Sequence, residues 1–286
     1  MDFQKVAVLG GGLLGGSLAL ALRARERPVA LWARREETVA AAKARGIHDA
    51  TGDLAEALKG ADLVILSTPV GAMATVLLNA RCAGLSPEAL ITDVGSVKAS
   101  PHRVLKPLLE KTPLRFIGSH PMAGSEQTGI GAADAQLFED AACLLTDDDG
   151  VGAPWTTRLQ AFWELLGSRV TWMGAEAHDA LVARISHFPH LMAAVTAKVA
   201  LTDPEEGRFG GGGLRDTTRV AGGDPVMWAE IAVENRDALR GVLQDGIREM
   251  SEMLAMLESG DQEALRQWLA IAKQARDDSR SAVESP

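Results

Sequence analysis

A glycine-rich turn close to the start of the chain constrains the fold more than any other feature of the sequence. The apolar run Lys5–Gly10 leads into the pattern G-x-G-x-x-G, and a segment with helical spacing follows. Gly10 permits a tight turn, Gly12 lets a pyrophosphate approach the backbone, and Gly15 lets helix and strand pack closely. Because a helix N-terminus attracts anions, the turn predicts a dinucleotide site. Its residues are Gly10, Gly12, Leu13, Leu14 and Gly15.

Short apolar runs typical of strands alternate with helical patterns through residue 174. The runs are Lys5–Gly10, Pro28–Trp32, Asp62–Ser67, Ala89–Asp93, Arg115–Gly118, Ala142–Thr146 and Arg169–Met173. Apolar strands joined by helical crossovers are typical of a parallel sheet that is buried on both faces. We therefore predict an α/β fold whose N-terminal domain, residues 1–174, is a Rossmann-type dinucleotide-binding domain with a mostly parallel sheet.

Beyond Gly174 the sequence shows helical spacing and no strand pattern. Helices are expected over Glu176–Leu201, over Asp224–Glu258 and over Gln262–Arg276, with a glycine-rich stretch between the first two. Asp224 and Pro225 are a good helix start, since an acidic N-cap is followed by proline in the first turn. We predict an all-helical second domain over residues 175–286.

The composition of the 286 residues removes several classes of protein. No tyrosine is present, which excludes the usual short-chain dehydrogenases and aldo-keto reductases because both use a tyrosine hydroxyl as acid and base. A net charge of −9 argues against a nucleic-acid partner. Apolar stretches are too short for a membrane span, and no signal peptide is recognisable. With Cys82 and Cys143 as the two cysteines, we expect no metal site and a cytoplasmic protein.

The end of the second predicted strand bears on the choice of dinucleotide. An NAD-selective site normally places an acid there to bind the ribose hydroxyls, but Trp32 is followed by Ala33, Arg34 and Arg35. Arg34 can pair with a 2′-phosphate, so we favour NADP over NAD and leave dual use open. Two solvated arginines at a helix start are the competing interpretation. The polar turn after the next long strand adds Ser67, Thr68 and Pro69 to the predicted cofactor site.

Two polar segments that follow predicted strands carry candidate catalytic groups. His120 is a candidate base because an imidazole is readily poised near neutral pH, and Ser96 is a candidate to orient it. Lys98 is a competing base, although a lysine must be desolvated to lose its proton. His187 and His190 flank a proline inside a predicted helix, a local violation that is typical of functional sites.

Five motifs in fixed order resemble the prephenate/arogenate dehydrogenase family of tyrosine biosynthesis. They are GGGLLGGSLA, DVGSVK, GSHPMAGSE, ISHFPHL and GLRDTTRVAGGDPVMW, and the resemblance runs from about Val6 to Leu269. It implies a Rossmann domain, a helical domain that forms a homodimer, and oxidative decarboxylation of a small cyclohexadiene substrate with hydride transfer to NAD(P). His120 then resembles the catalytic histidine, Ser96 the serine that orients it, and Arg219 the arginine that binds the ring carboxylate.

The same resemblance implies further contacts to the substrate. His190 resembles the histidine near the substrate side chain, while Gly212 and Trp228 resemble residues that line the pocket. Ser125 lies in the same motif as His120, and Glu126 resembles an acid at the mouth of the site.

Two other functions are compatible with a Rossmann domain followed by helices. A β-hydroxyacid or 6-phosphogluconate-type dehydrogenase would need a catalytic lysine in the helical half, where Lys198 and Lys273 lack the expected glycine-rich setting. A non-catalytic NADP sensor would bind the dinucleotide without turnover. The choice between prephenate and arogenate, and feedback inhibition by tyrosine, stay open at this stage.

Overall fold

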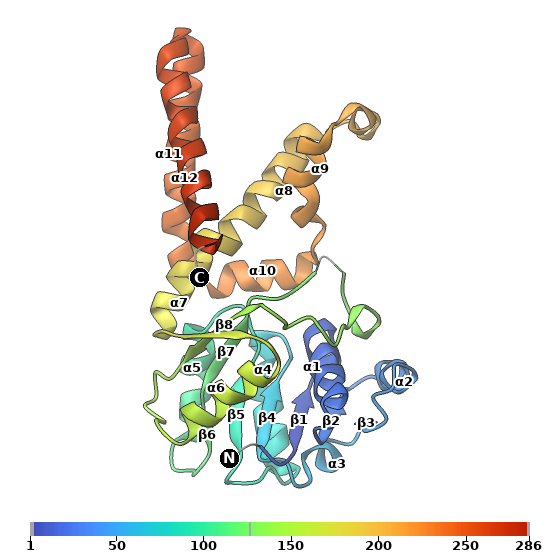
Figure 1. The fold of residues 1–286 in the computed structure, drawn as a ribbon. Helices are drawn as coiled ribbons and strands as arrows, with labels where there is room; N and C mark the ends of the chain where they lie inside the picture. The colour runs from blue at the N-terminus through green and yellow to red at the C-terminus, as the bar shows by residue number, and fades with distance from the viewer. Residues whose placement is uncertain (1–2, 126, 285–286) are drawn as a thin grey trace. The chain divides into compact units, whose positions relative to one another are not determined.

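The structure is a computed structural model that describes residues 3–125 and 127–284 (Figure 1). Two compact units make up the chain, Met1–Arg236 and Asp237–Pro286, and both sheets lie in the first. The predicted division into residues 1–174 and 175–286 follows the change from mixed to helical sequence, and it stays a prediction about domains.

The central sheet of the first unit has six parallel strands in the order β3-β2-β1-β4-β5-β6 (Figure 1). The strands are β1 (Val6–Leu9), β2 (Val29–Trp32), β3 (Ala50–Thr51), β4 (Leu63–Leu66), β5 (Leu90–Asp93) and β6 (Arg115–Phe116). This order reverses its winding between β1 and β4, and doubly wound folds bind dinucleotides at that reversal. The predicted parallel sheet is confirmed. β3 was missed because Ala50 and Thr51 stand between Asp49 and Gly52 and belong to no apolar run.

Alternate residues of the strands pack into two separate hydrophobic cores, one on each face of the sheet. Val6 and Val8 belong to one core, and Ala7 and Leu9 belong to the other. The first core is covered by α1 (Leu13–Ala24) and α6 (Trp155–Leu165), and the second by α3 (Leu54–Leu58), α4 (Val70–Cys82) and α5 (Ala99–Leu109). The predicted burial on both faces is therefore confirmed.

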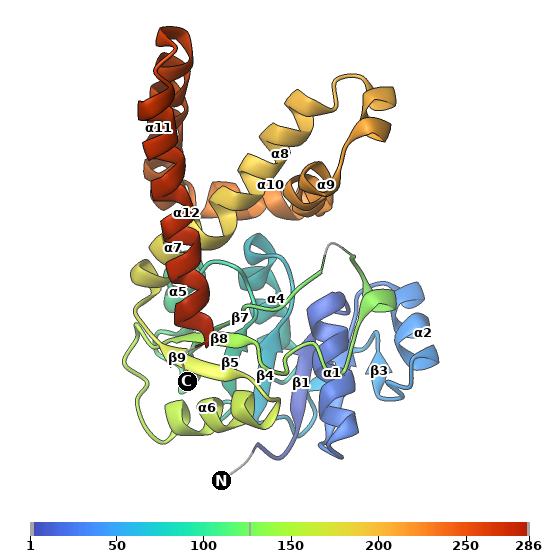
Figure 2. The same cartoon turned by 45° about the horizontal axis from the view of Figure 1, so that its top comes forward.

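A second, three-stranded sheet carries the strand with the candidate base (Figure 2). Its strands are β7 (Gly118–Pro121), β8 (Ala142–Thr146) and β9 (Arg169–Trp172). β7 pairs antiparallel with β8, and β8 pairs parallel with β9. The GSHPMAGSE motif, Gly118–Glu126, follows β6 as predicted, but its first four residues, Gly118–Pro121, form a strand that was not predicted. These residues form β7 because their backbone pairs with β8 and the Ser119 amide donates to Asp93 Oδ1 at 3.1 Å.

The helical part of the first unit begins directly after β9. α7 (Ala175–Val182) passes through a π-helical turn, Ala183–His187, into α8 (Phe188–Ala200). The wider turn comes just before Pro189, which lacks the amide hydrogen that a regular helix would use. α8 and α9 (Gly212–Thr218) form an arm, and α10 (Pro225–Glu234) follows.

The long helix predicted over Asp224–Glu258 is two helices. α10 ends at Glu234, and α11 (Arg236–Ser259) begins after Asn235, whose side chain donates to the Asp179 carbonyl at 2.9 Å. In the second unit α11 turns at Gly260, which has φ +68°, into α12 (Gln262–Glu284). The predicted α/β fold with a helical C-terminal region is confirmed. Among the described residues, no helix is both long and apolar enough to cross a membrane.

Candidate active site

The turn between β1 and α1 has the geometry that a diphosphate requires. Gly10 has φ +131°, and a Cβ on Gly10 would lie 2.0 Å from the Ser67 carbonyl oxygen. A Cβ on Gly15 would lie 1.9 Å from the Gly10 carbonyl oxygen, so larger residues are excluded at both positions. A Cβ on Gly12 would meet nothing within 4 Å, and no side chain caps α1 there. Open glycine backbone and free helix amides together fit an anionic group.

Two further sites predicted for the cofactor lie at the ends of β4 and β2. Ser67 follows β4, and Thr68 Oγ1 is buried without a hydrogen-bond partner among the described residues, while the exposed Pro69 starts α4. A buried hydroxyl with no partner is uncommon and fits a ligand contact. Arg34 and Arg35 are exposed after β2.

The acids that follow these arginines do not occupy the end of β2. Glu36 and Glu37 belong to α2 (Glu36–Ala44), and the Arg35 Nε lies 3.9 Å from Glu37 Oε1. An arginine therefore stands closer to the strand end than any acid of this segment.

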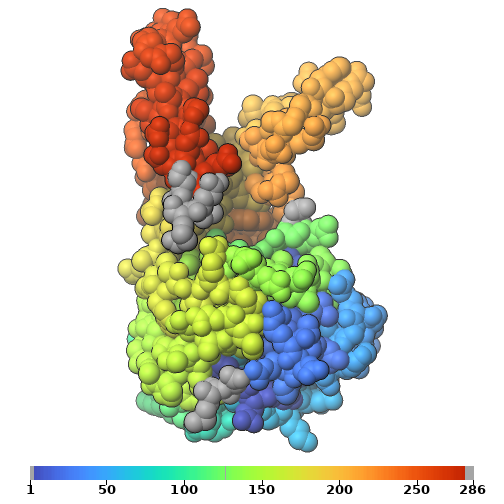
Figure 3. Space-filling view, in the orientation of Figure 1, coloured from blue at the N-terminus to red at the C-terminus, as the bar shows by residue number. Residues whose placement is uncertain are grey.

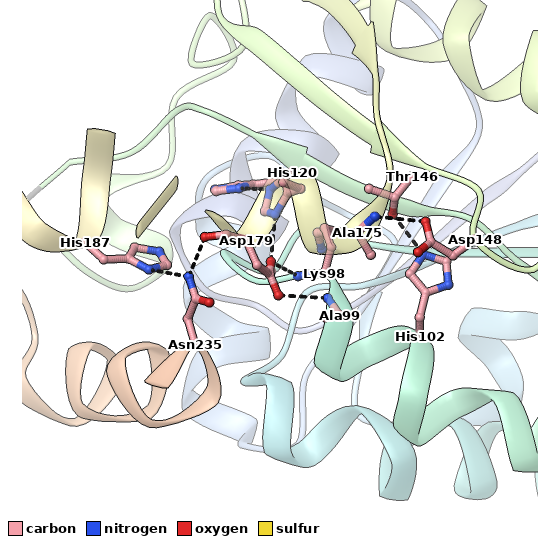
Figure 4. Close-up of polar contacts among 12 residues, drawn as sticks. Lys98, Ala99, His102, His120, Thr146, Asp148, Ala175, Asp179, His187 and Asn235 are labelled. Atoms are coloured by element: carbon pink, nitrogen blue, oxygen red, sulfur yellow. Dashed lines mark hydrogen bonds and ion pairs between the residues drawn. The ribbon is translucent and has the colours of Figure 1, made fainter. Parts of the chain in front are cut away.

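His120 is a buried histidine on β7 and is hydrogen-bonded to a second histidine. His120 (labelled in Figure 4) is 7% exposed. Its Nδ1 lies 2.8 Å from Nε2 of His178 on α7. Burial lowers the pKa of His120 well below its ordinary value, and the neighbouring His178 and the charge of Lys98 lower it further. The imidazole is therefore neutral near pH 7, which a general base requires.

The second histidine is held in turn by a carboxylate. His178 Nδ1 lies 2.8 Å from Asp179 Oδ1, and His178 is fully buried. Asp179 also accepts the backbone amides of Lys98 at 2.7 Å and Ala99 at 3.0 Å, at the start of α5 (Figure 4). Burial alone would raise the pKa of the Asp179 carboxyl, but the hydrogen bonds from His178 and the two amides outweigh it and lower that pKa.

Lys98 is fully buried and forms an ion pair with Asp93 at the end of β5. Burial lowers the pKa of Lys98, while the carboxylate of Asp93 opposes the shift. Asp93 also accepts the amide of Gly95 at 2.8 Å and that of Ser119. Asp93 therefore links the end of β5 to β7 beside His120. The ammonium group of Lys98 is already paired with the Asp93 carboxylate.

Ser96 and Ser125, the other described polar candidates of this region, are less buried than His120. Ser96 is half-buried, and among the described residues no hydrogen bond joins it to His120. Ser125 is exposed, and its Oγ accepts the amide of Gln127 at 3.0 Å. Glu126 lies outside the described residues.

The π-helical turn and α8 bring two histidines against one tryptophan. The rings of His190 and Trp228 are stacked, with centroids 3.5 Å apart and an interplanar angle of 9°. His187 meets the edge of Trp228 at 6.1 Å and lies 3.1 Å from the Asn235 amide through its Nδ1. His187 Nε2 and His190 Nδ1 are buried without a partner in the described part of the chain, which fits a polar ligand nearby.

The arginine and glycine predicted for the substrate lie on the exposed arm. Gly212 begins α9, where a Cβ would meet nothing within 4 Å, and Arg219 is exposed in the short helical segment Arg219–Gly222. Among residues 3–125 and 127–284, no group of three or more His, Cys, Asp or Glu side chains could hold a metal ion.

Sequence reasoning missed His178 and Asp179. Both lie on the buried face of α7. They share this face with Ala175, Val182 and Ala183, which are three or four residues away along the helix. Polar residues on an apolar helix face must find polar partners inside the protein, and that mismatch was the available signal.

Comparison with known proteins gives two matches to family models that together span most of the chain. Residues 18–172 match the nucleotide-binding domain of prephenate dehydrogenase, and residues 174–271 match its dimerization domain. Cyclohexadienyl dehydrogenase from Zymomonas mobilis is 35% identical over 283 residues, which cover 96% of this chain and 95% of that one.

Two solved structures share the fold over nearly their full length. Prephenate dehydrogenase from A. aeolicus, in complex with hydroxyphenyl propionate and NAD+, has a TM-score of 0.88 and 28% identity, with 97% of this chain and 99% of that one covered. Synechocystis arogenate dehydrogenase has a TM-score of 0.78 and 30% identity, with 96% and 99% covered. The chain belongs to the prephenate dehydrogenase family.

Proposed function

We propose that this protein catalyses the oxidative decarboxylation of prephenate or arogenate, with NADP as the preferred hydride acceptor. The observation that carries the proposal is the buried, neutral imidazole of His120 on β7, beside the carboxyl end of a doubly wound sheet. Membership of the prephenate dehydrogenase family supports the reaction class. The same membership disfavours the β-hydroxyacid dehydrogenase and sensor interpretations.

The residues at the carboxyl ends of β1 and β4 would hold the dinucleotide. Gly10, Gly12 and Gly15 leave room for the diphosphate at the start of α1, and Thr68 has an unused buried hydroxyl. When bound, the nicotinamide supplies the acceptor for the hydride that leaves the ring carbon bearing the hydroxyl. The absence of an acid at the end of β2, where Arg34 stands, supports a 2′-phosphate and hence NADP.

His120 handles the proton of the reaction. As the ring carbon loses its hydride, the imidazole accepts the proton of the ring hydroxyl, and the carbon–oxygen bond becomes a carbonyl. Loss of the ring carboxylate as CO2 leaves its electron pair in the ring, which becomes aromatic. His120 then returns the proton to the phenolic oxygen, giving 4-hydroxyphenylpyruvate or tyrosine. Such a base contributes a rate factor of about 10²–10⁴.

The substrate needs a cation because it carries carboxylates and the protein has a net charge of −9. We assign the ring carboxylate to Arg219, whose planar guanidinium can donate two parallel hydrogen bonds. His190 and Trp228, stacked on one another, supply a flat surface for the side chain of the substrate. Ser96 is proposed to orient His120 and the nicotinamide, Ser125 to contact the substrate, and Glu126 to act as the acid at the mouth of the site.

We further propose a homodimer that forms through the helical part of the chain. Within the first unit, α8 and α9 form a projecting arm (Figure 3). Apolar residues of α8 are exposed on it, Val195 at 45% and Val199 at 75%. The match of residues 174–271 to a dimerization domain supports the same conclusion.

We also propose that the protein is cytoplasmic. Both of its cysteines, Cys82 and Cys143, are free thiols, as is usual in the reducing cytoplasm.

One assay tests the reaction and both open choices. The purified protein is mixed with prephenate or with arogenate, each with NADP and with NAD, and the reduced nicotinamide is followed by its absorbance. We expect turnover that depends on one of the two substrates, with a higher kcat/KM for NADP than for NAD. If neither substrate is oxidised with either dinucleotide, the proposed function is wrong.

A further inference from the structure

Three side chains form a continuous hydrogen-bonded chain that starts at the candidate base. His120 Nδ1 lies 2.8 Å from His178 Nε2, and His178 Nδ1 lies 2.8 Å from Asp179 Oδ1. His120 lies on β7 of the second sheet. His178 and Asp179 lie on α7, the helix that follows β9, the last strand of that sheet. All three are buried, with exposed fractions of 7%, 0% and 6%. Solvent water therefore has little access to these three side chains, and their hydrogen-bonding groups must pair with one another or with other protein groups.

The carboxylate at the end of this chain determines where each proton lies. Asp179 accepts two backbone amides at the start of α5 as well as the contact from His178, so it is an ionised acceptor. An ionised carboxylate cannot donate, so His178 must carry its proton on Nδ1. A neutral His178 then presents a lone pair on Nε2, and His120 must donate to it from Nδ1. The remaining nitrogen of His120, Nε2, is left with a free lone pair.

We propose that His178 and Asp179 are positioning residues that fix the tautomer of His120, so that Nε2 is the atom that accepts the substrate proton. The proposal rests on the proposed function of His120 as the base. A neutral imidazole without such a partner would distribute its proton over both nitrogens, and only one of the two tautomers can act as the base at a given ring position. The chain of His178 and Asp179 keeps the whole population in the competent form.

The surroundings of the two rings support neutral histidines. Burial lowers the pKa of His178, as it does that of His120, and the positive charge of Lys98 lowers both. The other titratable groups that face the pair are His187 on the π-helical turn, Asp93 at the end of β5 and Asp179 itself. When His120 takes the proton, the imidazolium gains a charge-assisted bond to His178 and the attraction of the Asp179 carboxylate.

A purely structural role for the pair is the competing explanation. Asp179 also holds the first amides of α5, so its loss would weaken the attachment of α7 to the sheet domain whatever happens at His120. The test must therefore read the proton on His120 directly. Imidazole nitrogens with and without hydrogen are well separated in the ¹⁵N spectrum, which makes the tautomer observable without any measurement of activity.

The first experiment uses the wild-type enzyme labelled with ¹⁵N-histidine. The signals of His120 and His178 are assigned by loss of the corresponding peak in His120→Asn and His178→Gln. We expect both residues to carry hydrogen on Nδ1 and none on Nε2 near pH 7.5. Hydrogen on Nε2 of His120 would overturn the proposal, and hydrogen on Nε2 of His178 would overturn the part assigned to Asp179.

The second experiment compares two substitutions at His178 that differ in one property. His178→Gln places an amide oxygen near the former Nε2 and can still accept from His120, whereas His178→Leu cannot. Because an unsatisfied buried N–H is strongly disfavoured, we expect kcat to fall about 10- to 100-fold in His178→Leu and by less than about tenfold in His178→Gln. The Nδ1 hydrogen of His120 should persist in the glutamine variant and be lost from part of the population in the leucine variant.

A matched control separates this effect from loss of stability. His102 on α5 is also buried and bonds through both ring nitrogens, to Thr146 Oγ1 at 2.8 Å and Asp149 Oδ2 at 3.1 Å. His102→Leu should lower Tm yet leave kcat and the His120 tautomer unchanged. If His178→Leu behaves like His102→Leu, the pair has only a structural role. Absence of turnover in the wild type would instead contradict the proposed function, and the tautomers would still be measurable.

Discussion

The residues that directly follow Ala33 at the end of β2 are basic. Arg34 and Arg35 are both exposed there, but Arg35 lies 3.9 Å from Glu37 in the first turn of α2. A charge-assisted hydrogen bond contributes more than a neutral one, and Arg34 is the better candidate to supply it.

We expect Arg34→Ala to lower kcat/KM for NADP about 10- to 100-fold and to leave kcat/KM for NAD nearly unchanged, because contacts to a charged group are worth about 1.5–3 kcal/mol. Initial rates at varied dinucleotide concentration measure both values. Arg35→Ala is the matched control and should shift the ratio less. An NADP-to-NAD ratio that stays constant in Arg34→Ala would remove the 2′-phosphate assignment.

The arginine assigned to the ring carboxylate can be tested against its neighbour in the same segment. Arg219→Gln should raise the KM for prephenate or arogenate about 10- to 100-fold through loss of a charge-assisted pair. Arg215→Gln, also exposed and four residues earlier, removes the same charge from α9. If both variants raise KM equally, the effect comes from net charge and the specific assignment to Arg219 is wrong.

Single residues were predictable where the residue type itself is unusual. The sequence alone pointed to three features: the glycines of the first turn, the two arginines after β2, and His120 in the GSHPMAGSE motif. His178 and Asp179 were not, because each is ordinary in a helix and becomes informative only when α7 buries that face. The hydrogen bond between His120 and His178 joins residues 58 positions apart, and no local pattern encodes it.

The π-helical turn and the start of α8 place His187 and His190 against Trp228. Nδ1 of His187 also lies 3.1 Å from the side-chain amide of Asn235, the residue that separates α10 from α11. Helical spacing predicted continuous helices at both places because the apolar period runs through them. Pro189, which lacks an amide hydrogen, accompanies the first break, and Asn235 marks the second. The side chain of Asn235 donates to the Asp179 carbonyl and contacts His187, and these contacts depend on the assembled fold.

This element should make the protein sensitive to acid. Burial lowers the pKa of His187 to about 4 from the ordinary 6.5. Between these pH values the unfolded chain binds a proton that the folded chain refuses, so the free energy of unfolding decreases as pH falls from 6.5 toward 4. His120 and His178 are shifted in the same direction and add to the slope.

Thermal unfolding at a series of pH values measures this dependence. We expect Tm to fall with decreasing pH across that window and to fall less steeply in His187→Asn, in which Oδ1 can still accept from Asn235. The exposed His48 provides the control, and His48→Asn should leave the slope as in the wild type. Equal slopes in wild type and His187→Asn would show that His187 does not stay neutral in the folded protein.

At the scale of the whole molecule the fold class was predictable, whereas the assembly was only implied. Strand composition and spacing were sufficient for a parallel sheet with two buried faces, since a strand buried on both sides must be apolar throughout. The helical region carried no such signal, because helical spacing marks an apolar face without saying what covers it. A partner chain could cover such a face, and the family resemblance implies a homodimer.

The second unit presents an apolar stripe that fits this answer. Ile247, Met250, Leu254 and Leu257 of α11 repeat at spacings of three and four residues, and their exposed fractions lie between 40% and 58%. Val242, Met253 and Met256, on another face of the same helix, are half-buried. Spacing of this kind is typical of a helix that packs against another helix, and the exposed stripe therefore has the pattern expected of a dimer contact.

We expect the double substitution Ile247→Asp and Leu254→Asp to convert the dimer to a monomer at micromolar concentration. Full burial of each aliphatic side chain is worth about 1.5–3 kcal/mol, and a two-fold interface loses each contact twice. Sedimentation velocity measures the species directly. Glu252→Lys changes a charge on the opposite side of α11 and should remain dimeric. If the aspartate variant also stays dimeric at the lowest measurable concentration, another surface, with the α8 arm as the next candidate, holds the two chains together.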